Sequence, residues 1–117
     1  MTNEPTAIER RKWPRESVQL PAQYFVKNQS LKYQDCKIVS ISRNGAAVIF
    51  PQLEFLKEQF FVFLDIMVPK SFHQLTLRGE VRIRYREQNG IVGGIQFDTL
   101  VAEPMFDKLI AGEKTKH

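Results

Sequence analysis

The sequence has few of the residues that build catalytic and metal centres. Among its 117 residues there are one cysteine, Cys36, and two histidines, His73 and His117. A lone cysteine forms no internal disulfide, which favours a reducing compartment such as the cytoplasm. No His, Cys or carboxylate cluster has the spacing of a metal site, and no motif supports a Cys–His or Ser–His–Asp arrangement. We therefore expect a cytoplasmic protein that is not an enzyme, with no catalytic residue, no metal site and no cofactor, and with Cys36 as a buried apolar side chain.

Long apolar segments are also absent. No uncharged apolar run approaches the roughly 18 residues that a membrane-spanning helix needs, and the N-terminal segment MTNEPTAIERR is unlike a secretory signal. Lysine and arginine (17) outnumber aspartate and glutamate (13), so the formal charge is +4. This excess suggests an anionic partner. The length and the 43% hydrophobic content fit a single domain over residues 1–117.

Alternation of apolar and polar residues dominates the chain, and this pattern predicts β-strands. The clearest segment is 75–86, whose predicted inward set is Leu75, Leu77, Gly79, Val81, Ile83 and Tyr85. Other strands are expected over 18–26, 31–42, 46–50, 60–68 and 91–97. In the second of these, Cys36 and Ile38 are predicted to lie on one face, with Val39 and Ile41 on the other. Because closure removes exposed strand edges, we predict an all-β fold, a six-stranded antiparallel barrel over 16–98.

The segments that flank the predicted barrel differ in character. Residues 1–15 are polar and basic, and we predict a flexible arm there, since Pro14 opposes a helix. Residues 99–112 predict a short C-terminal helix that starts near Pro104, stops at Gly112 and packs against the sheet. Strand 60–68 is apolar on both faces, so either this helix or a helical turn over 53–59 is expected to cover its outer side.

Two short constellations suggest ligand binding. Arg11 and Arg15 lie four residues apart on one side of an extended chain, roughly 13 Å from each other, and Arg10 precedes them. Guanidinium groups pair bidentately with phosphate oxygens and with guanine O6 and N7. Trp13, between them, is expected to plug the barrel mouth or to cover a base.

The second constellation is the segment from Ser40 to Gly45. Ser40 and Ser42 are predicted to share a face, from which their hydroxyls can contact a phosphate or a base edge. A tight turn is expected at Arg43-Asn44-Gly45, because Asn and Gly tolerate positive φ. Gly45 would also give a planar ligand room to approach the backbone.

In this order the two constellations resemble the motifs of the PilZ domain family, R-x-x-x-R followed by (D/N)-x-S-x-x-G. Arg11 and Arg15 match the paired arginines, Arg10 matches an arginine often found before them, and Ser42 and Gly45 match the second motif. Ser40 stands where the family has Asp or Asn. The resemblance covers nearly the whole chain and implies a six-stranded barrel. It also implies binding of the bacterial second messenger cyclic di-GMP through Arg10, Arg11, Arg15, Ser40, Ser42 and Gly45.

The resemblance implies that ligand binding repositions the arm and so signals to a protein effector of the motility, pilus or exopolysaccharide machinery. Two alternatives stay open. Since Ser40 departs from the motif, the chain is alternatively an adaptor with the PilZ fold that works without the ligand. It is alternatively a small barrel that binds nucleic acid through a stripe of arginines on the strand 75–86, namely Arg78, Arg82, Arg84 and Arg86.

Overall fold

Six strands and one helix make up the part of the chain that the computed structural model describes, residues 13–26, 32–51, 60–88 and 90–114. The strands are β1 (Glu16–Phe25), β2 (Gln34–Ile41), β3 (Gly45–Phe50), β4 (Phe60–Met67), β5 (Gln74–Glu87) and β6 (Gly90–Phe97), and the helix is α2 (Glu103–Lys114). Every predicted strand is confirmed, with ends shifted by at most a few residues. The predicted fold class, an all-β domain with a C-terminal helix, is confirmed.

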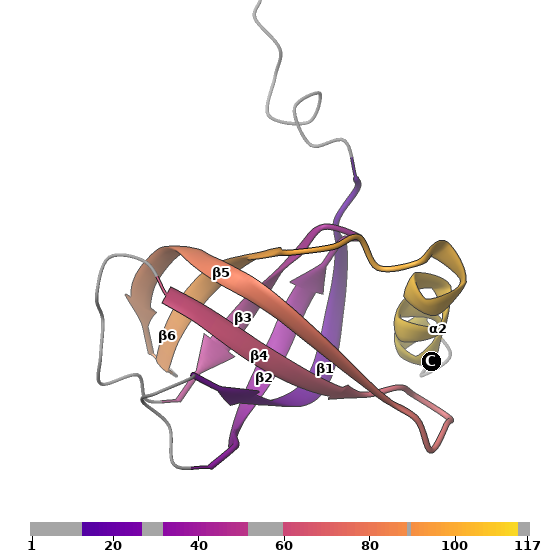
Figure 1. The fold of residues 1–117 in the computed structure, drawn as a ribbon, viewed down its shortest axis with the longest axis horizontal. Helices are drawn as coiled ribbons and strands as arrows, with labels where there is room; N and C mark the ends of the chain where they lie inside the picture. Colours follow the sequence, from indigo (N-terminus) through magenta and orange to yellow (C-terminus); the bar gives the residue numbers. More distant parts are fainter. Residues whose placement is uncertain (1–12, 27–31, 52–59, 89, 115–117) are drawn as a thin grey trace, which may run out of the picture.

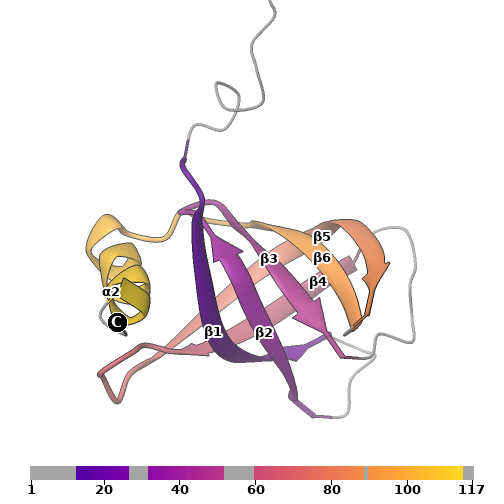
Figure 2. The same ribbon diagram turned by 180° about the vertical axis from the view of Figure 1, so that it is seen from behind.

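The strands close into a barrel in the order β1-β2-β3-β6-β5-β4. All neighbours are antiparallel, and pairing of β1 with β4 joins the two ends of the sheet. Figures 1 and 2 show this barrel from opposite sides, with α2 beside it. Closure satisfies the backbone groups of each strand on both sides, which leaves no long unpaired edge among these six strands.

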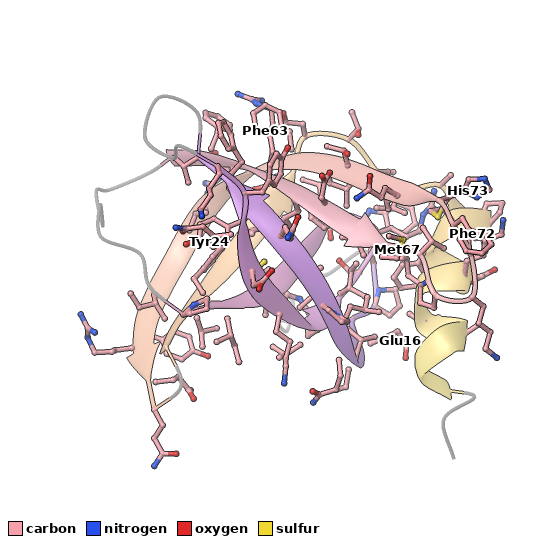
Figure 3. The ribbon with its side chains drawn as sticks, turned by 90° about the horizontal axis from the view of Figure 1, so that it is seen from below. Glu16, Tyr24, Phe63, Met67, Phe72 and His73 are labelled. Carbon is pink, nitrogen blue, oxygen red and sulfur yellow. The ribbon has the colours of Figure 1, made fainter. Side chains whose placement is uncertain are left out.

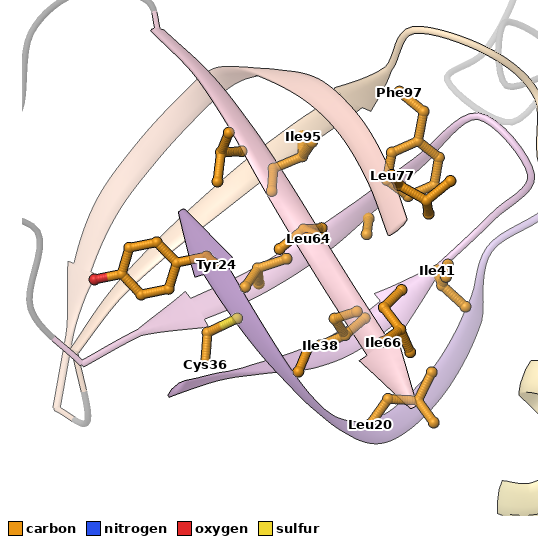
Figure 4. Packing of buried hydrophobic residues seen from close by; sticks show 14 of the residues in the cluster. Leu20, Tyr24, Cys36, Ile38, Ile41, Leu64, Ile66, Leu77, Ile95 and Phe97 are labelled. Atoms are coloured by element: carbon orange, nitrogen blue, oxygen red, sulfur yellow. The ribbon is translucent and has the colours of Figure 1, made fainter. Parts of the chain in front are cut away.

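Every second side chain of β1 points into the interior of the barrel. Val18, Leu20, Ala22 and Tyr24 are all buried, and Figure 4 shows Leu20 and Tyr24 among the core side chains. The ring of Tyr24 meets that of Phe50 edge to face, with centroids 4.8 Å apart. Its hydroxyl donates a 2.7 Å hydrogen bond to Gln34 Oε1, so this core phenol has a polar partner.

A β-bulge in β2 overturns one predicted pattern. Alternation places Ile38 and Ile41 on opposite faces, yet both are fully buried. The pairing of β2 with β3 shifts between Ile38 and Ser40, so one extra residue is inserted at Val39. A bulge changes which face the following residues take. The predicted face for Ile41 was therefore wrong, and Ser40 lies on the outer side of the barrel.

A second bulge, in β5, overturns the inward placement of Tyr85. The register with β6 shifts between Val81 and Ile83, and Tyr85 is 54% exposed. Leu77, Gly79 and Val81, which precede the shift, are buried as predicted. The extra residue changes the alternation at this point of the strand, so the bulge interrupts the predicted stripe of arginines.

Helix α2 packs beside the start of the barrel. Leu109 is fully buried, and Met105, Phe106 and Ile110 pack against the core, mainly next to β1. The helix runs past Gly112 to Lys114, so the predicted stop was wrong; a single glycine weakens a helix by only about 1 kcal/mol. None of the described helices is long and apolar enough to cross a membrane.

The outer face of β4 does not receive the cover that its apolar sequence predicted. Phe61 and Met67 remain 42% and 53% exposed, because α2 lies by β1. The other predicted cover, a helical turn over 53–59, lies outside the described residues. The Phe61 ring is partly screened by the guanidinium of Arg78, whose Cζ lies 4.0 Å from the ring centroid.

Candidate functional site

The β2–β3 turn is built around the hydroxyl and backbone of Ser42. The Ser42 amide donates to the Gly45 carbonyl at 2.8 Å, and its Oγ donates to Asn44 Oδ1 at 2.7 Å. Ser42 is only 1% exposed. Ser42, which was predicted to contact a ligand, thus also stabilises the turn. Serines at strand ends commonly form such local hydrogen bonds.

Gly45 is required by packing within the sheet. A Cβ at this position would lie 2.5 Å from the backbone oxygen of Ile95 in β6. Among the described residues, positive φ angles occur at Lys70 and Gly90 but not at Asn44 or Gly45. The expectation that Asn44 and Gly45 are chosen for positive φ was therefore wrong; the close approach of β3 to β6 is the reason for the glycine.

Strand register brings the end of the arm to this turn. In the β1–β2 pair, Glu16 lies opposite Ile41 and Ser17 lies opposite Ser40. Arg15 directly precedes Glu16, and Ser42 directly follows Ile41. Arg15 and the Ser40–Gly45 segment, whose nearest predicted site residues are 25 positions apart in the chain, thus lie at one corner of the barrel. We call it the arm–turn corner (Trp13–Ser17 and Ser40–Gly45). Figure 2 shows the start of β1 and the end of β2 side by side there.

Arg43 ties the arm, the turn and the C-terminal segment together. Its guanidinium carbon lies 4.7 Å from the centroid of the Trp13 ring, a cation–π contact. Its Nε donates to the Val101 carbonyl at 2.7 Å, and the Val101 amide donates to the Arg43 carbonyl at 2.8 Å. Val101 lies two residues before α2. Trp13 therefore packs on the turn, and is not one of the core residues that fill the barrel.

The structure describes some of the predicted site residues and not others. Arg10 and Arg11 lie outside the described residues. Arg15 is exposed at the corner, and Ser40 is half-buried on the outer face. Arg43 was missed by the sequence reasoning, although a cation inside the turn beside Ser42 was an available signal.

Cys36 is an inert core thiol. It is buried in β2, and burial, followed by the charge of Asp35, raises its pKa from 9.0 to about 12. The thiolate is the reactive species, so very little of it exists in the folded protein at neutral pH.

We therefore expect Cys36 to resist a disulfide reagent such as DTNB in the native protein and to react promptly after unfolding in urea. The release of the coloured thiolate measures both rates. A fast reaction of the native thiol would contradict its inert assignment.

Two of the arginines of β5, Arg78 and Arg82, have polar partners. Arg78 forms an ion pair with Asp98, and Arg82 contacts Glu80 at 3.5 Å and Gln96 at 2.9 Å. The bulge divides this strand between the two faces. Two partnered cations contribute less to an electrostatic surface than they would in the predicted stripe of four unpaired arginines.

In the described ranges, no group of three or more His, Cys, Asp or Glu side chains is arranged to hold a metal ion. What the described residues do assemble is a cationic, hydroxyl-bearing corner on a rigid barrel.

The described part of the chain is by its fold a small closed antiparallel barrel with a C-terminal helix. The PilZ domain model matches residues 9–111, and the chain belongs to the PilZ domain family. PilZ domains are receptors for cyclic di-GMP, or adaptors, and are not enzymes.

Solved structures share this fold. The Bacillus subtilis inhibitor of motility, MotI/DgrA, superposes with a TM-score of 0.64 at 17% sequence identity, over 94% of this chain and 55% of that one. This chain thus spans about half the length of MotI/DgrA. The PilZ domain of CeSA from a cellulose-synthesizing bacterium gives a TM-score of 0.60 at 18% identity, over 89% of this chain and 99% of that one. No curated protein matches the sequence.

Proposed function

We propose that this protein binds cyclic di-GMP at the arm–turn corner and relays binding to a protein effector. The observation that carries the proposal is the pairing of Glu16 with Ile41, which sets Arg15 beside the serine-bearing turn. Membership of the PilZ family supplies the ligand class. The position of Arg15 next to a strand end that pairs beside Ser40 and Ser42 supports this choice of site.

The chemistry of the corner suits an anionic nucleotide. Arg10, Arg11 and Arg15 would contact phosphates and the Hoogsteen edge of guanine, because the guanidinium fork matches both. Ser40 would offer its hydroxyl from the outer face, and Gly45 keeps the turn close to β6. Ordering the arm costs about 1–2 kcal/mol per residue of backbone entropy, so each arginine contact matters.

The relay would pass through Arg43. This side chain contacts Trp13 of the arm and the Val101 carbonyl, and Val101 leads into α2. A ligand that draws the arm over the corner would separate Trp13 from Arg43 or press the two together. Either change alters the surface formed by the arm and the start of α2. An effector protein of the motility, pilus or exopolysaccharide machinery would bind this altered surface.

Trp13 provides a direct test, because it is the only tryptophan in the chain. We expect cyclic di-GMP to change the Trp13 emission saturably, at the same midpoint that calorimetry gives for binding. In Arg43→Ala, loss of the cation–π contact should shift the ligand-free emission to the red and reduce the ligand-induced change.

Two results would contradict this proposal. Calorimetric binding without any change in emission would exclude the arm from the site. Absence of binding altogether would favour the ligand-independent adaptor.

Ser40 is the departure from the family motif and gives a gain-of-function prediction. A carboxylate accepts two hydrogen bonds from guanine N1–H and N2–H₂, whereas one serine hydroxyl cannot. Hydrogen bonds to charged groups contribute about 1.5–3 kcal/mol, so Ser40→Asp should tighten binding by about tenfold or more in calorimetry. Ser40→Ala serves as the matched control and should change affinity much less. Weaker binding by Ser40→Asp would refute this account of the departure.

A further inference from the structure

The β4–β5 hairpin exposes an aromatic side chain that neither the barrel nor the arm–turn corner uses. Phe72 has a relative exposure of 102%, the largest among the exposed hydrophobic residues that the structure describes. Figure 3 shows Phe72 and His73 at the tip of the hairpin, next to α2. Complete exposure of a phenyl ring in water is unfavourable, so its place on the tip calls for an apolar partner.

The tip holds this exposed position through its own hydrogen bonds. The Val68 amide donates to the His73 carbonyl at 3.0 Å. The His73 amide donates to Ser71 Oγ at 3.0 Å, and Lys70 adopts a left-handed φ of 58°. These bonds fix the backbone on both sides of Phe72, so the ring is presented by a formed turn.

Cations flank the exposed ring. Lys70 from the hairpin and Lys108 from α2 line a hollow of about 540 Å³ together with Phe72 and Ala111. No carboxylate is among the described residues that line it. The chain as a whole carries a formal charge of +4. An apolar tip between lysines complements a surface that is negatively charged outside and apolar beneath.

We propose that the hairpin tip (Lys70 and Phe72), together with the neighbouring Lys108 of α2, docks on an anionic lipid surface. Phe72 inserts between the headgroups, and the two ammonium groups stay at the level of the phosphates and carboxylates. The tip is separate from the arm–turn corner: in Figures 1 and 2, α2 lies between the start of β1 and this hairpin. Docking at the tip therefore leaves the corner open, and it requires no dinucleotide.

Vesicle sedimentation of the full chain without dinucleotide tests the proposal. The wild type should sediment with vesicles of phosphatidylcholine mixed with phosphatidylserine and much less with pure phosphatidylcholine, and added salt should weaken the binding. Phe72→Ser should lower the partition coefficient by about tenfold. Lys70→Gln and Lys108→Gln should each lower it by about fivefold.

Matched controls at the opposite end of β5 locate the effect. Tyr85→Ser removes an exposed aromatic ring, and Arg86→Gln removes an exposed cation; both should bind the mixed vesicles as the wild type does. Equal losses in these controls, or an unchanged partition coefficient in Phe72→Ser, would overturn the proposal. Absence of wild-type binding to both vesicle types would also overturn it and would indicate that the tip binds a protein partner.

Discussion

Replacing Arg15 by alanine is expected to weaken cyclic di-GMP binding by about fivefold to a hundredfold, and Arg11→Ala should act similarly. A bidentate contact of arginine with a guanine edge contributes roughly 1–3 kcal/mol, which corresponds to this range of affinity. We expect such a contact for Arg15 because β1 begins next to it and pairs with the end of β2. Isothermal titration calorimetry measures the effect.

The design of this experiment separates a specific contact from general charge. Arg86→Ala removes the same charge from the far end of β5, where the side chain is exposed, and should bind as the wild type does. Arg11→Ala/Arg15→Ala should show no measurable binding. Unchanged affinity in both single variants would refute the role of the arm, whereas an equal loss in Arg86→Ala would indicate unspecific attraction.

Gly45→Ala is expected to destabilise the folded protein by about 2–4 kcal/mol, as severe overpacking does. The added methyl carbon would lie 2.5 Å from the backbone oxygen of Ile95. A backbone oxygen within a paired strand cannot move aside without disturbing the ladder between β3 and β6. Urea unfolding followed by circular dichroism measures the loss, and Ala47→Ser, at a half-buried neighbouring position, is the control.

This variant also distinguishes two roles for the glycine. If Gly45 serves only to give a ligand clearance, Gly45→Ala would fold with normal stability and lose only its affinity. If the clash with Ile95 is the reason for the glycine, the free energy of unfolding falls even in the absence of any ligand. Normal stability together with lost binding would therefore refute the packing explanation and restore the ligand-clearance interpretation.

The fold was accessible from the sequence to a large extent. Alternation located all six strands, because a closed barrel separates an apolar interior from a polar exterior at every second residue. It failed at Ile41 and Tyr85, each of which follows a bulge. At a bulge, two residues of one strand lie opposite a single residue of the neighbouring strand. The sequences of β2 and β5 carry no local signal for this extra residue.

The candidate site was accessible in part. The arginine and serine motifs can be recognised in the sequence itself. The motif residues that the structure describes, Arg15, Ser40 and Ser42, lie at one corner. The reason for Gly45 was not predictable, because it depends on a backbone oxygen of Ile95 in β6, which strand pairing brings close. The same holds for Arg43, whose partners Trp13 and Val101 are 30 and 58 residues away.

By itself, then, the amino-acid order determined the period-two strands, the basic segment ahead of the first of them and the polar turn, since these follow from nearest-neighbour preferences and side-chain chemistry. Tertiary structure alone decided that Glu16 pairs with Ile41, that Arg43 joins Trp13 to Val101, and that Lys108 of α2 shares a hollow with Lys70 and Phe72. The physical reason is that strand register and helix docking are set by long-range packing of the whole barrel, and no short stretch of chain encodes such packing.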